Sequence, residues 1–460
     1  MRLKYDIMDR PRGFVLFNLA LQQMLAILAA TVAVPMVVGH GLAPAAAMFG
    51  AGIGTIVYIV MTKRRSPMLL GSNFSFVGSM IAAFAGGVSA GLGMLGLIIG
   101  VTAAGIIYVI LAVIVKKVGV KWIDTLMPPV VIGPTVSVIG LSLAGNAVSN
   151  LRTGDVFTVT EQGENVALAT GHFPLICGLV TFAVTVICSI YGRKTLKLIP
   201  FLIGIIAGYA VALTFTFIGL GTGTDEMVIT KLGVFEEMMM PDGQVTISTF
   251  VGLPDFVFLR SIDGLGELTP AYIITIVTAY VPVAFVGFAE HIADHKNLSS
   301  IVNKDLLTDP GLDRTLLGDG LGSIAGAFFG GCPNTTYGES IACVALTGNA
   351  STITTLTASL GCMLMSFVTP FVAFINSIPS CVMGGLCIAL YGFIAVSGLK
   401  MIQHIDLDEN RNIFVISVIL IAGIGGLSIN FGAVTITEVA AALILGILTN
   451  LIVKKRSRPS

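Results

Sequence analysis

Long apolar runs recur along the whole chain, and they decide the solvent in which it can fold. A membrane-spanning helix needs about 20 consecutive apolar residues, because the hydrocarbon core of a bilayer is about 30 Å thick. Only 11% of the residues are charged, too few to cover the surface of a water-soluble protein. The sequence therefore predicts an all-α, multi-pass integral membrane protein. Its clearest spans are expected at 14–38, 43–62, 91–115, 126–146, 173–191, 198–220, 269–292, 351–375, 380–398, 412–429 and 433–453.

Three further apolar stretches are shorter, or are interrupted by Gly, Pro and polar residues; they lie at 67–86, 314–331 and 333–347. Counting them gives about fourteen spans. With a cytoplasmic N-terminus and a change of side at each span, only Arg152, Lys231 and Arg260 of the 25 Lys and Arg residues fall outside. Cytoplasmic loops are rich in Lys and Arg. We therefore expect a cell-membrane protein with both termini in the cytoplasm and with 147–172 and 221–268 outside.

The composition also argues against several classes of function. The net charge is zero, so there is no electrostatic basis for binding nucleic acid. The seven Cys residues include no CxxC pair and mostly lie in apolar runs, so we expect small buried side chains rather than metal ligands or disulfides. No nucleophile–base pair or cofactor-binding loop is evident. We therefore expect neither an enzyme nor a bound cofactor or metal.

Two of the interrupted stretches occupy matching places in the order of spans. They would be the third and the tenth span, which correspond if the chain consists of two seven-span halves. An odd number of spans in each half gives the halves opposite orientations. Paired, interrupted spans in inverted repeats are the best sequence indication of a transporter's binding site. Because a broken backbone persists at membrane depth only beside a cavity or other protein, we expect a secondary transporter with its site at these breaks.

Ionisable residues inside predicted spans are costly and mark functional sites. Glu290 ends the apolar run of 269–292, and Asp294 follows at i+4, so both carboxyls lie on one helix face. His291 and His295 form a second i, i+4 pair about 100° further round. These residue types can bind metal, but they lack the H-E-x-x-H order of zinc enzymes, and a span end suits transport better. Asp294 and His295 could also simply begin a cytoplasmic loop.

Three further acids lie in or beside predicted spans: Glu339, Glu438 and Asp319. Glu339 ends the run GGCPNTTYGE, in which Pro333 and Gly338 prevent a regular helix from starting earlier. A short helix over 340–346 would present free backbone N–H groups and the positive end of its dipole at the break.

The third span supplies a counterpart to this break. It reads LLGSNFSFVGSM, with Gly71 at the expected break and Phe74 just after it. Such an arrangement suits a flat heterocycle. Phe74 or Tyr337 could stack on its ring, carboxylates could accept its N–H groups, and free backbone N–H groups could donate to its carbonyls.

Motifs around these residues resemble the nucleobase–ascorbate transporter family, specifically its bacterial uracil permease branch. The NTTYGE run is typical of that branch, whereas xanthine-type members usually carry Gln-Asn in place of Glu339 and Ser340. The resemblance covers the whole chain, because the matching stretches are spread across both halves. They are LQQMLAILAATVAVP (21–35), LGSNFSF (70–76), AEHI (289–292), NKDLLTDPGLDRTLLGDGL (303–321), CPNTTYGES (332–340) and IPSCVMGGLCIALYGFIAVSGL (378–399).

The resemblance implies an architecture of fourteen spans in two inverted repeats, with spans three and ten interrupted. It implies a core domain, built from 1–122 and 269–376, that holds the substrate. It implies a gate domain built from 123–268 and 377–460. It also implies a homodimer in the lipid bilayer that transports a nucleobase such as uracil together with a proton.

The resemblance also assigns site residues. The family's substrate-binding glutamate on span eight falls on Glu290, and its glycine–glutamate pair on span ten falls on Gly338 and Glu339. Its span-three aromatic falls on Phe74, and its span-ten tyrosine falls on Tyr337.

Proton coupling is expected at the end of span eight. Uracil is neutral at physiological pH, so its accumulation needs a co-transported ion. We expect Glu290 to carry the proton, because burial at the end of a long apolar run disfavours its charged form. Asp294, one helical turn on, is expected to take part.

The chain departs from the uracil branch at several positions. Comparable permeases have His four residues after the span-eight glutamate, where this chain has Asp294, and His follows as His295. They often have His on span one, where this chain has Gln23. The family signature would place Asn and Gly where Ser340 and Ala342 stand. We expect Gln23 and His295 near the substrate, and we leave open a purine permease of the xanthine type or, in a different class, a passive channel.

Overall fold

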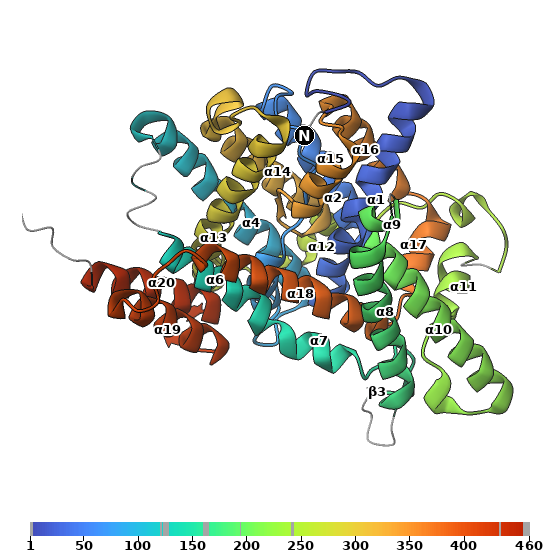
Figure 1. Cartoon of the computed structure of the whole chain (residues 1–460). Helices are drawn as coiled ribbons and strands as arrows, with labels where there is room; N and C mark the ends of the chain where they lie inside the picture. The colour runs from blue at the N-terminus through green and yellow to red at the C-terminus, as the bar shows by residue number, and fades with distance from the viewer. Residues whose placement is uncertain are drawn as a thin grey trace, which may run out of the picture.

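The chain is mostly helical in the computed structural model, which describes residues 3–119, 122, 128–159, 165–193, 195–240, 243–431 and 434–453 (Figure 1). Arg2, Lys121, Lys194 and the basic residues of 454–458, which entered the charge count, lie outside the described residues. Eight helical stretches in the described part are long and apolar enough to cross a membrane: Gly13–Val38, Pro44–Met61, Ala90–Val118, Pro129–Asn150, His172–Tyr191, Pro200–Thr222, Pro270–Val302 and Ser380–Ile402. The prediction of a multi-pass helical membrane protein is thereby confirmed.

The first half of the chain contains the following elements. They are α1 (Gly13–Val38), α2 (Pro44–Met61), β1 (Gly71–Ser72), η1 (Phe74–Phe76), α3 (Val77–Ala82), α4 (Ala90–Val118), α6 (Pro129–Ser142), α7 (Ala144–Asn150), β2 (Phe157–Val159), β3 (Asn165–Ala167), α8 (His172–Tyr191), α9 (Thr195–Leu198), α10 (Pro200–Thr222), η2 (Asp225–Met227), α11 (Gly233–Met239), η3 (Ile247–Thr249), α12 (Val257–Ser261) and η4 (Ile262–Glu267).

The second half opens with a longer helix and follows a similar order. Its elements are α13 (Pro270–Val302), η5 (Leu307–Gly311), α14 (Leu312–Gly330), β4 (Asn334–Thr335), α15 (Gly338–Thr347), α16 (Thr352–Met365), α17 (Thr369–Asn376), α18 (Ser380–Ile402), α19 (Asn410–Ile424), β5 (Ile429–Phe431), β6 (Val434–Ile436) and α20 (Glu438–Ile452). In each half two helices precede a short strand and a short helix. Both stretches expected to be interrupted, near residues 71 and 335, are thus broken by a strand.

Local sequence signals explain where the key helices begin and end. Proline is the first residue of α2, α10 and α13, where its missing N–H costs no helical hydrogen bond. At the start of α13 the Thr269 side chain accepts a hydrogen bond from the N–H of Tyr272. Gly348 ends α15 with a φ of 67°, a left-handed conformation that suits glycine.

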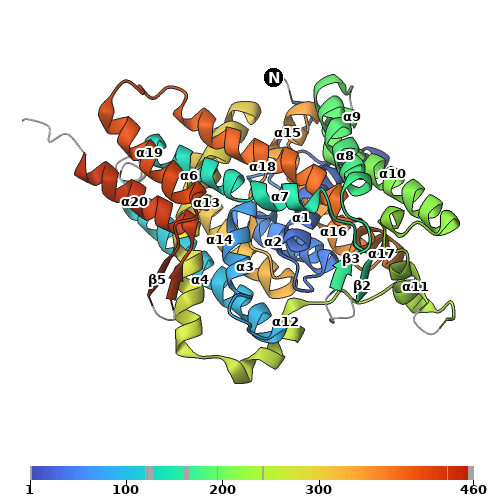
Figure 2. The same ribbon diagram turned by 90° about the horizontal axis from the view of Figure 1, so that it is seen from below.

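The helices form two bundles that lie side by side. In the first bundle α14 packs extensively against α2 and α4, α13 against α4, and α16 against α1 and α2. In the second bundle α18 packs against α6 and α8, α10 against α8, and α19 against α6 and α20. In both views the second bundle runs along one side of the first (Figure 1 and Figure 2). Fewer contacts join the bundles, chiefly from α13 to β6 and α20 and from α1 to α10. Helices α12 and η4 come before α13 in the sequence, but they pack on α4 of the first bundle.

A seam of small residues joins α2 to α14. Along α2 the seam positions are Ala46, Gly50 and Gly54, and the larger Tyr58 ends the row; along α14 they are Gly330, Gly326, Gly322 and Gly318. A Cβ added at Gly50 would lie 2.5 Å from the carbonyl oxygen of Gly326, and one added at Gly322 would lie 2.7 Å from that of Gly54. Backbone meets backbone along this seam, which is the close packing that small residues at every fourth position allow.

The two broken segments meet at the centre of the first bundle. Strands β1 and β4 pair antiparallel, with Gly71 opposite Thr335 and Ser72 opposite Asn334. The N–H of Asn73 continues the pairing by donating to the carbonyl of Pro333. Backbone groups that a helix would have satisfied are therefore satisfied between the two halves of the chain. This pairing also brings the starts of η1 and α15 close to each other.

Candidate substrate-binding site

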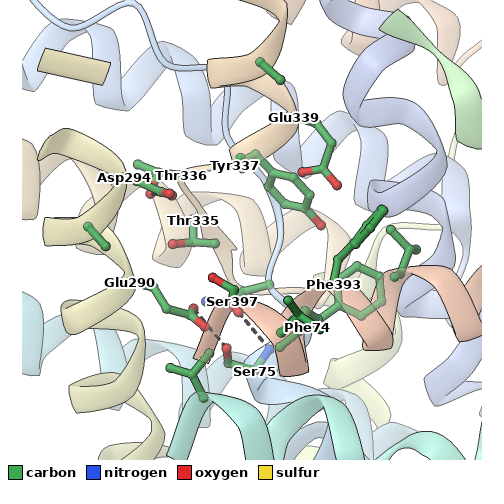
Figure 3. A pocket seen from close by; sticks show the side chains of 18 of the residues that line it. Phe74, Ser75, Glu290, Asp294, Thr335, Thr336, Tyr337, Glu339, Phe393 and Ser397 are labelled. Carbon is green, nitrogen blue, oxygen red and sulfur yellow. Dashed lines mark hydrogen bonds between the residues drawn. The ribbon is translucent and has the colours of Figure 1, made fainter. Parts of the chain in front are cut away.

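A cavity of about 590 Å³ lies between the two bundles, next to the β1–β4 pair. Its volume falls within the range of about 300–1,000 Å³ typical of small-molecule sites. The first bundle contributes residues of η1, α13, β4 and α15, and the second bundle contributes residues of α6, α10 and α18. Figure 3 shows the carboxyl groups of Glu290, Asp294 and Glu339 facing this common space from two helices.

Two carboxyls of α13 form one side of the cavity, as their i, i+4 spacing predicts. The Ser75 hydroxyl of η1 donates to Oε2 of Glu290 over 3.1 Å. The Thr336 hydroxyl donates to Oδ2 of Asp294 over 2.7 Å. Each carboxyl is half-buried and has one hydroxyl donor. Both segments that were expected to break thus supply a donor to this pair of acids.

The start of α15 forms the adjoining wall. Helix α15 begins at Gly338, and Glu339 lies in its first turn. A Cβ added at Gly338 would meet no atom within 4 Å, so backbone is open to the cavity at this point. Unpaired N–H groups at a helix start attract acceptors such as carbonyl oxygens. The short helix predicted over 340–346 lies within α15, which begins two residues earlier than predicted.

The two predicted aromatic residues both line the cavity, but they are held differently. The Tyr337 hydroxyl donates to the carbonyl oxygen of Ser72 over 2.6 Å, and its ring packs against Gly71, so it ties β4 to β1. The ring of Phe74 lies edge-on to Tyr391 of α18, with centroids 5.9 Å apart. Phe74 therefore lies where the bundles meet.

The second bundle supplies a mostly apolar wall. Phe201 of α10 and Phe393 of α18 line it, together with Ser397 and Lys400 one and two turns further along α18. Phe393, Ser397 and Lys400 are exposed, so the protein does not close the cavity on that side. Lys400 is one of the residues that the charge distribution assigns to the cytoplasmic side.

Gln23 and His295 are not among the residues that line the cavity. The Gln23 amide donates at 3.5 Å to the hydroxyls of Ser340 and Thr355, inside the first bundle. His295 is fully buried on another face of α13, where Nε2 lies 2.7 Å from the hydroxyl of Tyr58. The expectation that Gln23 and His295 lie near the substrate thus gains no support from this geometry.

The other α13 histidine belongs to a second buried network. His291 Nδ1 lies 2.8 Å from Oδ2 of Asp319, and its Nε2 lies 2.9 Å from the hydroxyl of Thr315. The Thr315 hydroxyl also lies 3.1 Å from the carbonyl oxygen of Leu312. Thr335, which lines the cavity, donates to the same Asp319 oxygen over 3.4 Å. The acid on α14 therefore supports the cavity wall from behind.

Glu438 is also placed away from the cavity. It lies in the first turn of α20, and a Cβ added at Gly78 of α3 would be 3.7 Å from its Oε1. Among the residues that the structure describes, no group of three or more His, Cys, Asp or Glu side chains could hold a metal ion.

Sequence reasoning missed several residues that line the cavity. Ser75 and Thr336 supply the donors to the α13 acids, and both lie in the broken segments, where small polar residues gave a usable signal. Phe393 and Ser397 lie in a long apolar run, in which no interruption indicates a binding site.

The arrangement as a whole can bind a small flat molecule that presents N–H donors to the carboxyls and a carbonyl to the start of α15.

Comparison with known proteins gives a consistent result. A family model described as "Permease family" matches residues 15–430. The chain is 37% identical over 455 residues to a uracil permease of Bacillus caldolyticus, covering 98% of this chain and 95% of that protein. It is 34% identical to a uracil permease of Bacillus subtilis, covering 98% and 95%, and 33% identical to one of Escherichia coli K12, covering 98% and 94%.

Solved structures of low sequence identity share the fold. The chain resembles the murine solute carrier 26 family member A9 anion transporter in its inward-facing state, with a TM-score of 0.64 and 12% identity, covering 97% of this chain and 69% of that one. It also resembles the transmembrane domain of the cyanobacterial bicarbonate transporter BicA, with a TM-score of 0.54 and 15% identity, covering 96% and 98%.

Proposed function

The chain belongs to the Permease family, the nucleobase–ascorbate transporters that its motifs indicated, and from this premise we propose that it imports uracil together with a proton across the cell membrane. It is a membrane transport protein and not an enzyme. The uracil permeases that it resembles along nearly their whole length support the choice of substrate.

One observation carries the proposal: carboxyls and a helix start face one cavity between the bundles. Uracil has two N–H donors and two carbonyl acceptors on a flat ring. Its N–H groups would donate to Glu339 and Glu290, and a carbonyl would accept from the open backbone near Gly338. Phe74 would contact the ring face or edge. Charge-assisted hydrogen bonds to carboxylates are about twice as strong as neutral ones, so Glu339 would dominate recognition, while Glu290 would accept through its carbonyl oxygen when it holds the coupled proton.

We assign proton coupling to Glu290, with Asp294 as its partner. Both acids lie on one face of α13, and no Lys or Arg side chain in the described part of the chain forms an ion pair with either. Two like charges in a half-buried place disfavour simultaneous ionisation. A proton taken up by this pair on the outside and released when the cavity opens inward would drive accumulation of a neutral substrate.

We further propose the complete architecture of fourteen spans in two inverted repeats. The helices α3, α14, α15, α16, α19 and α20 would complete the six spans that length and hydropathy alone do not identify. The first bundle would be the core domain and the second the gate domain, with the boundary before α12 rather than at 268, because α12 packs on α4. Both termini would be cytoplasmic, and the protein would act as a homodimer in the bilayer.

Uptake of labelled uracil into proteoliposomes tests this function. With an imposed inward proton gradient, the purified protein should concentrate uracil above the outside level, and a protonophore should abolish the accumulation. Equilibration without accumulation would indicate a channel instead. Binding of uracil in competition with xanthine and hypoxanthine would decide between the uracil and the xanthine type, and a preference for xanthine would refute the proposed substrate.

A further inference from the structure

Residues 3–9, which precede α1, lie along the connection from α15 to α16. The N–H groups of Lys4 and Tyr5 both donate to the carbonyl of Gly348, over 2.7 and 3.2 Å. The N–H of Ala350 donates back to Tyr5 over 2.9 Å, and the N–H of Thr352 donates to the carbonyl of Ile7 over 3.0 Å. Tyr5 and Asn349 form a parallel β-bridge. The terminal segment is therefore hydrogen-bonded to the chain at the far end of the helix that carries Glu339.

Ile7 inserts its side chain into the packing behind the site. It is 4% exposed and belongs to a buried apolar cluster of the first bundle. The cluster includes residues of α15, of the C-terminal part of α13 and of the stretch that leads into β1: Ile341, Val344, Leu298, Val302, Met68 and Leu70. One side chain of the terminal segment thus belongs to a cluster that includes residues of α13 and α15, the two helices that supply the cavity's carboxyls.

Helix geometry links this cluster to the cavity. Ile341 is two residues after Glu339, so the two side chains point about 200° apart on α15. When the apolar face of α15 is fixed against the cluster, the Glu339 carboxyl is fixed toward the cavity. α15 has only ten residues, too few for a stable helix on its own. Its direction therefore depends on what packs against it.

An ion pair fastens the same segment to α13. Lys304 Nζ lies 2.6 Å from Oδ2 of Asp6, just beyond the end of α13. Both side chains are about half exposed, so the pair is worth little alone. Together with the backbone bonds to Gly348, it places the terminal segment between α13 and α15, the two helices that supply the cavity's carboxyls.

We propose that residues 3–9 are a positioning strap that sets the direction of α15 and so holds Glu339 in place for substrate. The claim that the strap sets the direction of α15 is structural and stands by itself. The claim that it thereby affects substrate binding rests on the uracil-binding function proposed above. Ile7 is the positioning residue, and it acts on substrate through Glu339 without touching the cavity.

The structural claim is tested by hydrogen–deuterium exchange of the purified full-length protein in lipid nanodiscs. Ile7→Ala removes packing from a buried cluster and should speed exchange of the α15 amides by about tenfold or more, with α18 unchanged. If Ile7→Ala does not fold, Lys304→Gln, which removes only the ion pair, should still speed α15 exchange by about twofold to fivefold. Arg65→Gln removes the comparable exposed pair with Asp309 and should leave α15 unchanged.

Unchanged amide exchange in α15, or an equal increase in α15 and α18, would refute the proposed strap.

The effect of the strap on substrate is tested by a double-mutant cycle on uracil binding. Ile7→Ala should weaken binding in the native background and have much less effect once Glu339→Gln has removed the contact. An equal factor in both backgrounds refutes action through Glu339, and Ile7→Val should restore most of the affinity. Absence of uracil binding by the native protein would refute the proposed function, and the exchange result would still decide the strap.

Discussion

Replacing Glu339 by Gln should weaken uracil binding more than any other isosteric change of a cavity carboxyl. The substitution keeps the size but turns a group that only accepts hydrogen bonds into one that also donates. Among the described residues, no side chain donates a hydrogen bond to Glu339, whereas Ser75 donates to Glu290 and Thr336 donates to Asp294. Of the three acids, Glu339 is therefore the one whose carboxyl no described side-chain donor occupies.

The size of the effect follows from the bond that is lost. A hydrogen bond to a charged group contributes about 1.5–3 kcal/mol, and each 1.4 kcal/mol is about a factor of ten in affinity. The dissociation constant for uracil should therefore rise by about 10- to 150-fold. Part of any change could come from α15 itself, because an acid in the first turn of a helix stabilises it by about 0.3–1 kcal/mol.

Glu438→Gln is the matched control for that second effect. Glu438 also lies in the first turn of a helix, α20, but it does not line the cavity. Scintillation proximity or calorimetric binding of uracil to the purified variants should show the large loss for Glu339→Gln only, with both variants equally folded by thermal unfolding. Native-like affinity of a folded Glu339→Gln protein would remove Glu339 from the binding site.

Other outcomes follow from the proton-coupling assignment, the external loops and the topology. Glu290→Gln should still bind and exchange uracil but should not accumulate it in response to an imposed pH difference; proteoliposome uptake that persists would move the coupling role elsewhere. Asp155→Ala should destabilise the protein by about 1–3 kcal/mol in thermal unfolding, because Asp155 accepts the hydroxyl of Ser380 over 2.6 Å at the start of α18. Burial raises the pKa of Asp155 above its usual 3.8, so the folded state binds the proton of the Asp155 carboxyl more tightly than the unfolded state does. The free energy of unfolding should therefore fall as pH rises from about 3.8 through the raised pKa. Asp155→Asn should flatten this pH dependence. A cysteine placed at Gly243 should react with a membrane-impermeant reagent added from outside and one placed at Arg65 should not, and the reverse pattern would refute the orientation.

The sequence indicated the location of the site better than its detailed contacts. Interrupted spans and buried acids are rare in a membrane protein because both are costly there, and this rarity singled out Glu290, Glu339 and Phe74. All three line one cavity. The charge distribution and the motifs gave the multi-pass helical class for the same reason, since a bilayer allows few alternatives.

Face assignment on α13 was beyond the reach of the pattern. Acids and histidines alternate as two i, i+4 pairs, so periodicity shows that Asp294 and His295 point in different directions but not which direction is the cavity. The structure turns the acids to the cavity and packs His295 against Tyr58 of α2. That choice depends on how α13 sits between the bundles, which is a tertiary property. The apolar lining from α18, such as Phe393, was hidden for the same reason.

The seam between α2 and α14 has a consequence for how the protein is made. Its two sides lie in opposite halves of the chain, so α2 enters the membrane long before its partner is synthesised. Until α14 arrives, the row that includes Gly50 and Gly54 has no surface of matching shape to meet. The first half produced alone should therefore be an open, protease-sensitive set of spans, and co-expression of both halves as separate polypeptides should restore it. The contact between α2 and α14 therefore forms late in biosynthesis, whereas α8 and α10 of the other bundle, neighbours in the sequence, can pack as soon as they are inserted.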